Sequence, residues 1–270
     1  MTILTFSAVL LIFSFFAGLL GALTGLGGGV VIIPVLVLLF HINIHYAMGA
    51  SLISVIATSS GTAIAYLREG YINLRIGLFL ETSAVVGALL GALLIAFVSK
   101  SFLAVLFSLL LFFSAYLTMK RKEHLENYQT SHPWAIALKL DKANYHVQNV
   151  PLALGIMGFA GLISGLLGIG SGALKVLAMD QALRLPYKVS TTTSNFMIGL
   201  TAAVSVGIYF AHGYIQPVIV FPVSLGVLMG AFAGARVLPR IHTSSLRIIF
   251  SIVICFMGIQ MLYKTIAGTL

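Results

Sequence analysis

The stretch Thr24-Gly25-Leu26-Gly27-Gly28-Gly29 interrupts a long apolar run near the start of the chain, and Leu167-Gly168-Ile169-Gly170-Ser171-Gly172 interrupts another run at the equivalent place of a second half. The displacement that relates these stretches also carries Gly70-Tyr71-Ile72 onto Gly213-Tyr214-Ile215, with no gap. Agreement over that length indicates an internal duplication. Because glycine allows the backbone to leave helical geometry, each stretch is predicted to break a helix at the same point of its half.

Composition places the rest of the chain in lipid. Among 270 residues, 15 are Lys or Arg and 6 are Asp or Glu, while 60% are hydrophobic and the mean hydropathy is +1.09. No ordinary soluble core needs that balance. A helix that spans a bilayer needs roughly 20 apolar residues, and such segments cover nearly the whole sequence outside residues 120–148. No room remains for a separate soluble catalytic domain.

The predicted fold is an all-α polytopic membrane protein with glycine-broken helices. Ten apolar segments cover about residues 3–22, 29–44, 47–67, 76–98, 101–119, 149–168, 172–184, 189–211, 217–238 and 245–264. The duplication divides the chain into a first transmembrane repeat at 1–119, a cytoplasmic linker at 120–148 and a second repeat at 149–270. Hydropathy alone predicts eight segments, so 29–44 and 172–184 are either short spanning segments or re-entrant.

Positive charges indicate that the two halves are inverted repeats of about five segments each. With five crossings per half, one side of the membrane carries Arg68, Arg75, Lys120, Arg121, Lys122, Lys139, Lys142, Arg184, Lys188, Arg236, Arg240 and Arg247. Only Lys100 and Lys264 then lie on the opposite side. Parallel halves with four crossings divide these charges almost evenly. Since Lys and Arg concentrate in cytoplasmic loops, the inverted arrangement in the cytoplasmic membrane is favoured.

Several other classes of protein are excluded by the same residues. The net charge of +9 does not indicate a nucleic-acid partner, because the basic residues stand at the ends of apolar segments. The single cysteine, Cys255, permits no internal disulfide and no cysteine metal cluster. Neither HExxH nor a phosphate-binding Gly-Lys-Ser/Thr occurs. We therefore expect no metal, no cofactor and no enzymatic activity. The first segment lacks a basic leader, so we expect it to be retained.

The two breaks are the predicted binding site, because paired glycine-interrupted segments in two halves mark the substrate site of a transporter. Amides freed at such a break favour a small anion. Nearby hydroxyls and an amide can donate to oxyanion oxygens. The predicted substrate-binding residues are Thr24, Gly27, Gly28, Ser51, Gly170, Ser171, Lys175, Ser194 and Asn195. The alternatives are close helix packing for the glycines and a bond to the same helix for the hydroxyls.

Three ionisable residues inside or beside apolar segments break the symmetry of the duplication. Glu81, Lys175 and Asp180 correspond to Ser224, Ile32 and Val37 in the other half. Lys175 follows the second break, where a cation deepens an anion site; pairing with Glu81 and extension to the interface are the alternatives. Glu81 and Asp180 are the proton-coupling candidates. For Asp180 the alternative is an i,i+4 pair with Arg184.

Three motifs recur in order through both halves. The first half carries the glycine pattern from Gly18 to Gly29, then Gly49-Ala50-Ser51-Leu52 and Gly70-Tyr71-Ile72-Asn73; the second half repeats it through Gly168–Gly172, Thr193-Ser194 and Gly213-Tyr214-Ile215. This combination resembles the TauE/SafE sulfite exporter family over almost the whole chain. The resemblance implies transport of sulfite, sulfonates or related sulfur oxyanions across the cytoplasmic membrane, often as export. The sequence departs from the family pattern in the serine of the second break, the missing proline after it, and Lys175.

The prediction is therefore a secondary transporter, in the direction of export, for a small sulfur-containing anion such as sulfite or an organosulfonate. One anion is expected near the midplane, with access alternating as one repeat rocks against the other. The alternatives are an anion channel and a permease for sulfate, thiosulfate or a carboxylate. The predicted partners are the small anion and the lipid bilayer, and assembly into a homo-oligomer stays open.

Overall fold

The computed structural model describes residues 3–69, 73–120, 147–237 and 243–267, so most of the predicted linker lies outside the described residues. Every regular element in these ranges is helical, and the all-α prediction is confirmed. The first half contains α1 (Ile3–Thr24), α2 (Gly29–Pro34), the π-helix η1 (Val35–Leu39), α3 (Ile44–Glu69), α4 (Leu74–Leu94), the 3₁₀ turn η2 (Ile95–Phe97) and α5 (Lys100–Lys120). The second half contains α7 (Val150–Leu167), α8 (Gly172–Leu177), the π-helix η3 (Ala178–Ala182), α9 (Tyr187–Ala211), α10 (Pro217–Val237) and α11 (Thr243–Ile266).

The order of elements repeats along the chain. The displacement that carries Gly29 onto Gly172 also carries the first residues of α2, η1, α3, α4 and α5 onto those of α8, η3, α9, α10 and α11. The elements also pack in corresponding pairs: α1 lies along α10, and its counterpart α7 lies along α4. Each long opening helix therefore packs against a helix of the other half. This is the pattern that a duplicated chain produces.

Glycines end the two opening helices. Gly25 and Gly168 follow α1 and α7 with φ of 75° and 68°, the left-handed conformation that terminates a helix at low cost only for glycine. Their amides donate to the carbonyls of Gly21 at 3.1 Å and Ser164 at 2.8 Å. After Gly25 the chain turns back so tightly that a Cβ on Gly21 would collide with the backbone of Gly28. The predicted breaks are thus real interruptions of the helices.

The segments that follow the breaks are short. The helix α2 runs directly into η1, and α8 and η3 repeat that arrangement. At 1.5 Å per residue each combined segment covers about 16 Å, roughly half of a hydrocarbon core of about 30 Å. The helices stop before the predicted limits at 44 and 184, because His41 and its counterpart Arg184 adopt φ of 54° and 56°.

Six of the described helices are long and apolar enough to cross a membrane. They cover Leu4–Thr24, Leu74–Phe97, Lys100–Leu117, Val150–Leu167, Val189–Ala211 and Pro217–Arg236. Large apolar side chains such as Phe97 and Phe221 point outward, 85% and 69% exposed. A surface of that kind requires lipid as its solvent. The chain is a multi-pass membrane protein.

Small residues let the paired helices approach closely. A Cβ on Gly87 or Gly91 of α4 would collide with the carbonyls of Gly158 or Leu162 on α7. Gly230 of α10 is blocked in the same way by the Phe15 carbonyl of α1. These glycines have the packing role expected of small residues spaced four apart. They belong to the scaffold and not to a binding site.

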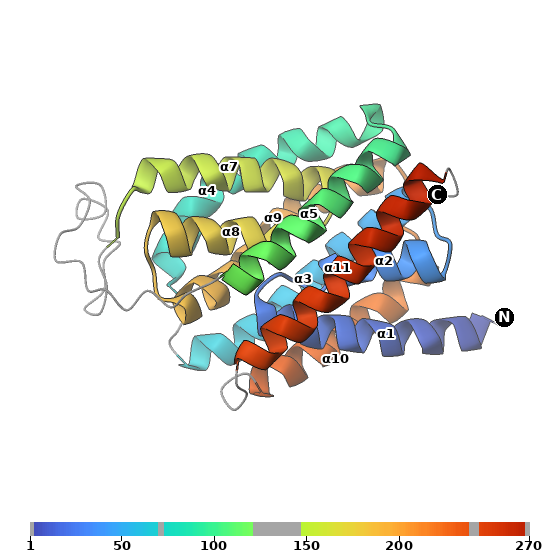
Figure 1. Ribbon diagram of the computed structural model, residues 1–270, viewed down its shortest axis with the longest axis horizontal. Coiled ribbons are helices and arrows are strands. Elements are labelled where there is room, and N and C mark those ends of the chain that lie inside the picture. Colours follow the sequence, from blue (N-terminus) through green and yellow to red (C-terminus); the bar gives the residue numbers. More distant parts are fainter. Residues whose placement is uncertain (1–2, 70–72, 121–146, 238–242, 268–270) are drawn as a thin grey trace.

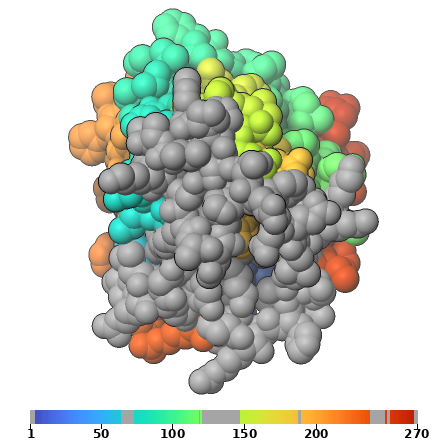
Figure 2. Space-filling view, turned by 90° about the vertical axis from the view of Figure 1, so that its left-hand side faces the viewer, coloured from blue at the N-terminus to red at the C-terminus, as the bar shows by residue number. Residues whose placement is uncertain are grey.

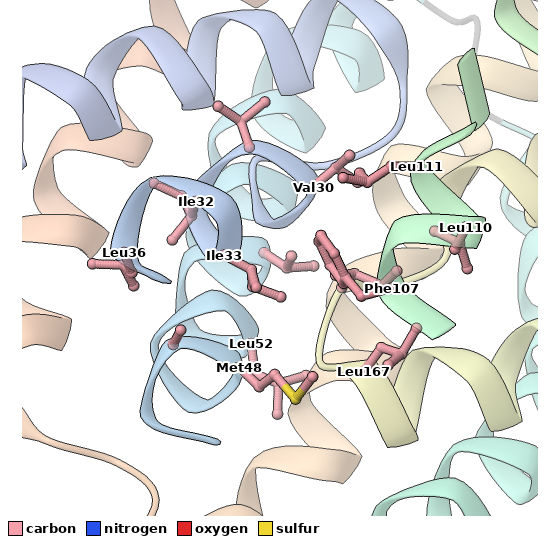
Figure 3. Close-up of a cluster of buried hydrophobic side chains, with 14 of the residues drawn as sticks. Val30, Ile32, Ile33, Leu36, Met48, Leu52, Phe107, Leu110, Leu111 and Leu167 are labelled. Carbon is pink, nitrogen blue, oxygen red and sulfur yellow. The ribbon is translucent and has the colours of Figure 1, made fainter. Parts of the chain in front are cut away.

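The figures show how the helices are arranged. In Figure 1, α1 begins at the right-hand end, where the chain terminus is marked N, whereas α7 begins at the left-hand end; α11 ends on the right, near the mark C. The view onto the left-hand end shows α4 and α7 side by side and α11 on the opposite flank (Figure 2). Figure 3 shows the apolar side chains of α2 and η1 enclosed by α3, α5 and α7. The labelled residues are Val30, Ile32, Ile33, Leu36, Met48, Leu52, Phe107, Leu110, Leu111 and Leu167.

Candidate functional site

The two glycine-rich breaks touch each other although they belong to different halves of the chain. A Cβ added to Gly29 would lie 3.4 Å from the Cα of Ile169, in the second break. A Cβ added to Gly172 would lie 2.8 Å from the Cα of Leu26, in the first break. The absence of side chains at both glycines is what allows the backbones to come this close. The two halves of the chain thus meet backbone to backbone.

Two apolar side chains close the space beside the breaks. Gly27 and Gly170 have φ of 77° and 75°, and both face Val55 of α3 and Ile198 of α9. Val55 and Ile198 occupy equivalent positions of the two halves, and both are completely buried. The breaks are therefore sealed by a symmetric pair of branched side chains, one from each half.

The start of α9 brings polar groups to the breaks. The Ser194 hydroxyl lies 3.4 Å from the Gly25 carbonyl and 3.3 Å from the Gly172 carbonyl, so it can donate to either break. The Asn195 side-chain amide donates to the Ala22 carbonyl at 3.2 Å, near the end of α1. Both side chains are fully buried. Of the predicted ligands, these two link α9 directly to the backbone at the breaks.

Several buried polar atoms around the breaks have no hydrogen-bond partner among the described residues. They are the hydroxyls of Ser51, Ser171 and Thr191 and the side-chain carbonyl oxygen of Asn195. Each of these residues is at most 2% exposed. An unsatisfied buried polar group costs about 1–3 kcal/mol, and such groups in native proteins usually meet a water or a ligand. Three hydroxyls that can all donate are therefore the strongest local indication of an oxyanion.

Ser171 also has an uncommon backbone conformation. Its φ is 46° and its ψ is 37°, the left-handed region that non-glycine residues rarely adopt. Its counterpart Gly28 has φ of −66° and ψ of −20°, an ordinary helical conformation. A non-glycine residue in this region costs of order 1 kcal/mol or more. That cost, together with the unpartnered hydroxyl, favours a ligand-binding role for Ser171.

The Thr24 hydroxyl points to its own helix. It donates to the Leu20 carbonyl at 2.9 Å, the bond to the residue four positions earlier that hydroxyls in helices commonly make. Gly28 accepts from the amides of Val31 and Ile32, each at 3.1 Å, and so begins α2. In this conformation both residues serve the local structure of the first break.

A cluster of charged and hydroxyl groups lies between α4, α8 and α9. The Lys175 ammonium donates to Glu81 Oε2 at 2.9 Å and to the Met197 carbonyl at 3.3 Å, and it is also in close contact with the Thr201 hydroxyl. The Thr201 hydroxyl in turn donates to Glu81 Oε1. The side chain of Lys175 is 0% exposed and that of Glu81 is 4% exposed. An ion pair with this degree of burial in a membrane helix bundle is expensive, and such residues are usually functional.

The family of the chain follows from comparison with known proteins. The profile of the family described as Sulfite exporter TauE/SafE matches residues 10–261. The chain belongs to this family. It is 32% identical to the probable membrane transporter protein YdhB of Bacillus subtilis over 84% of this chain and 89% of that protein. It is 28% identical to the probable membrane transporter protein YunE of the same organism over 96% of this chain and 98% of that protein.

A more distant relative comes from an archaeon. The probable membrane transporter protein MJ0441 of Methanocaldococcus jannaschii is 26% identical over 94% of each chain. No solved structure gives a significant match. The TauE/SafE protein described here is accordingly a membrane transporter and not an enzyme.

Two residues of this TauE/SafE site were not predicted from the sequence. Thr201 bridges Lys175 and Glu81, and Thr191, whose methyl group faces the Cβ position of Gly25, has an unpartnered hydroxyl. The duplication contained a signal for Thr201, because it corresponds to the hydroxyl residue Thr58. Thr191 corresponds to Met48, so nothing in the repeat pattern distinguished it from its polar neighbours.

The two proton-coupling candidates have different surroundings. Glu81 forms an ion pair with Lys175, which is one of the alternatives that the sequence left open for that lysine. Asp180 lies in η3, is 3% exposed, and accepts a hydrogen bond from the Gln181 side chain at 3.0 Å. Among the described carboxylates, only Glu81 contacts Lys175 directly. The charge state of Glu81 is therefore the one that depends on which group pairs with the lysine ammonium.

Proposed function

We propose that the protein is a secondary transporter that exports a small sulfur-containing anion, such as sulfite or an organosulfonate, across the cytoplasmic membrane. The anion binds where the two breaks meet, within reach of the hydroxyls of Ser51, Ser171 and Thr191 and of the side chains of Ser194 and Asn195. Lys175, one turn beyond Ser171, supplies the positive charge. Family membership supports the class of substrate, and the buried donors support an anion.

The observation that carries this proposal is a buried cation one helical turn beyond a residue with an unpartnered hydroxyl. Lys175 is completely buried, and its backbone amide donates to the Ser171 carbonyl at 3.1 Å, so the lysine is anchored to the second break. A buried ammonium with hydroxyl donors close by favours an oxyanion over a cation or a neutral solute. A purely structural cluster would be expected to satisfy its hydroxyls within the protein.

Alternating access requires a route to each side of the membrane. Val55 and Ile198 close the breaks in this conformation, which supports an occluded state. We propose that the two halves are inverted repeats and that access changes when one half rocks against the other. The opposite starting ends of α1 and α7 support this arrangement (Figure 1).

The distribution of charge supports the same topology. The charge count places Lys100 and Lys264 on the side opposite to the other basic loop residues. Both line one pocket of about 210 Å³, together with His41 and Asn43. Cysteines introduced at Lys100 and Lys264 should react with a membrane-impermeant thiol reagent from one side, and cysteines at Arg75 and Arg184 from the other, in a Cys255→Ser background. Labelling of all four positions from the same side would overturn the inverted arrangement.

Reconstitution into liposomes tests the function itself. Purified protein should transport sulfite or an organosulfonate in preference to sulfate, thiosulfate and a carboxylate. The flux should saturate and should be accelerated by substrate on the far side of the membrane. A flux that does not saturate and shows no trans-stimulation would favour an anion channel, and no flux of any of these anions would overturn the proposal.

A further inference from the structure

The Lys175 ammonium has no donor to spare in this conformation. It contacts three acceptors, Glu81 Oε2, the Met197 carbonyl and the Thr201 hydroxyl, and an ammonium group has three N–H donors. An anion can reach the ammonium only by displacing one of these acceptors. Glu81 is the acceptor that carries a charge, so it competes with an incoming anion for the same cation.

Few other charges lie on the elements packed around Glu81 in the described ranges. α7, which packs along α4, has no ionisable side chain from Val150 to Leu167. α9 has none from Val189 to Ile208. The remaining charged groups on these elements and on the adjoining α8 and η3 are Lys175, Asp180, Lys188 at the start of α9, and Arg75, which is exposed at the start of α4.

We infer that a monovalent anion takes the place of the Glu81 carboxylate at Lys175 and that Glu81 takes up one proton in the same step. The inference rests on the proposed function and names its coupling ion and the valence of its substrate. In the empty site the ammonium pairs with the carboxylate. In the loaded site the ammonium pairs with the anion, and Glu81 holds a proton given up by a hydronium ion on the open side. One O–H bond of hydronium breaks as the O–H bond on Glu81 forms, and no other covalent bond changes.

The proton follows from the cost of buried charge. A carboxylate that loses its counter-charge inside a low-dielectric bundle is strongly disfavoured, and protonation is the least costly way to remove that charge. Thr201 contacts both partners, so its hydroxyl can stay bonded to Glu81 in either protonation state by reversing donor and acceptor. The cluster can therefore change its occupant without leaving an unpaired charge.

The same balance selects the valence of the substrate. The empty site contains one positive and one negative charge, and the site loaded with a monovalent anion and a proton is also neutral. A divalent anion would leave one uncompensated negative charge in the bundle. We therefore assign the substrate class as singly charged oxyanions, such as hydrogensulfite and alkanesulfonates, and not sulfate or thiosulfate dianions.

The duplication limits the coupling to one proton for each anion. The counterpart of Lys175 is Ile32 in the first half, and the counterpart of Glu81 is Ser224 in the second half. Ile32 is completely buried, and the Ser224 hydroxyl donates to the Phe221 carbonyl at 3.0 Å in its own helix. The two positions related to the pair by the duplication therefore hold no second exchangeable pair.

The test measures proton and anion movement together in liposomes loaded with a pH-sensitive dye. Methanesulfonate is the monovalent probe and sulfate the divalent one. In the wild type, one proton should accompany each methanesulfonate, and an imposed membrane potential should not change the rate because the transport is electroneutral. Sulfate flux should be lower by about a hundredfold, because an unpaired buried charge is so costly.

Glu81→Gln should separate the anion from the proton. The empty site of this variant carries one positive charge, so methanesulfonate flux should become potential-dependent and lose its proton. Flux driven by a pH gradient should fall about tenfold or more.

Glu81→Asp should retain coupling. Ser224→Ala, at the equivalent position of the other half, is the matched control and should change neither flux nor coupling. The double variant Glu81→Gln/Lys175→Met, which removes both charges, should fold and transport neither ion.

Each outcome decides a different claim. Proton movement that persists in Glu81→Gln, or that is lost in Asp180→Asn instead, would overturn the role of Glu81. Wild-type methanesulfonate flux that is potential-dependent and carries no proton would overturn the coupling and leave the proposed function intact. Equal transport of sulfate and methanesulfonate would overturn the valence selection. No flux of any anion would overturn the proposed function as well.

Discussion

The two breaks agree in backbone conformation at two pairs of glycines but differ in the charge of the helix that follows. Gly25 and Gly168 have φ of 75° and 68°, and Gly27 and Gly170 have φ of 77° and 75°. In the helix that follows each break, however, the first half places Ile32 where the second half places Lys175. Both side chains are completely buried. The same local fold thus accommodates an apolar residue in one half and a cation in the other.

This difference separates the part of the duplication that forms the scaffold from the part that carries function. The break depends on backbone conformation and close approach, and glycine supplies both in each half. The charge depends on a partner from another helix, and α4 supplies that partner, the Glu81 carboxylate, to the second break. Every buried ion pair costs desolvation free energy. A second ion pair in the other half would therefore lower stability, and binding one anion does not require it.

The largest expected effect is at the charged position. Lys175→Met should reduce transport by about a hundredfold or more, because it removes the cation and leaves Glu81 buried without a counter-charge. Ile32→Met, the matched change in the other half, should alter transport only slightly and cost less than about 1.5 kcal/mol in stability. Initial rates in liposomes and thermal unfolding in detergent measure the two effects. Equal losses in both variants would show that the asymmetry between the halves has no functional meaning.

The second prediction concerns what the halves have in common. Gly25→Ala and Gly168→Ala should each destabilise the protein by about 2 kcal/mol or more, because both positions need a positive φ and have no space for a Cβ. The Met48 carbonyl lies 2.7 Å from the Cβ position at Gly168. The control is Gly155→Ala in α7, where nothing lies within 4 Å of the added atom. That variant should be neutral or up to about 1 kcal/mol more stable.

The third prediction separates two serines at equivalent positions. Ser194→Ala should lower the unfolding free energy by about 1 kcal/mol, because its hydroxyl is within bonding distance of both breaks. Ser51→Ala should leave stability unchanged or slightly higher, since its hydroxyl has no partner among the described residues, yet raise the KM for the anion. A Ser51→Ala variant with an unchanged KM would remove this hydroxyl from the binding site.

The smallest expected effect is at the strained residue. Ser171→Gly should raise the stability by about 1 kcal/mol, because glycine adopts the left-handed conformation without strain. The same change should weaken anion binding if the Ser171 hydroxyl is a ligand. Melting temperature and KM measured on one preparation test both effects. A loss of stability would contradict the assignment of strain.

Much of the fold could be predicted from the sequence. Apolar run length located the long helices, and the glycine pattern located both breaks to within a residue or two. The displacement between the halves relates the start of α3 at Ile44 to the start of α9 at Tyr187. The ends of the short helices were less predictable, because the left-handed conformations of His41 and Arg184 have no glycine to indicate them.

Less of the candidate site could be predicted. The buried hydroxyls near the breaks followed from the repeat, but the choice between bonded and unpartnered ones did not. Thr24 and Ser51 are both hydroxyl residues near the first break, yet one bonds to Leu20 in its own helix and the other has no partner among the described residues. That difference depends on rotamers and on neighbouring helices, which sequence spacing does not specify.

The local features follow from the residues alone: where the chain is apolar enough for lipid, where glycine permits a break, and that both occur twice. Which charges and which backbones meet depends on the packing of the helices. Lys175 and Glu81 are far apart in the sequence, and the two breaks are farther apart still, so their contacts depend on how helices of the two halves pack. Helix packing in lipid is set by the close fit of small residues across interfaces, a property of pairs of surfaces and not of one segment.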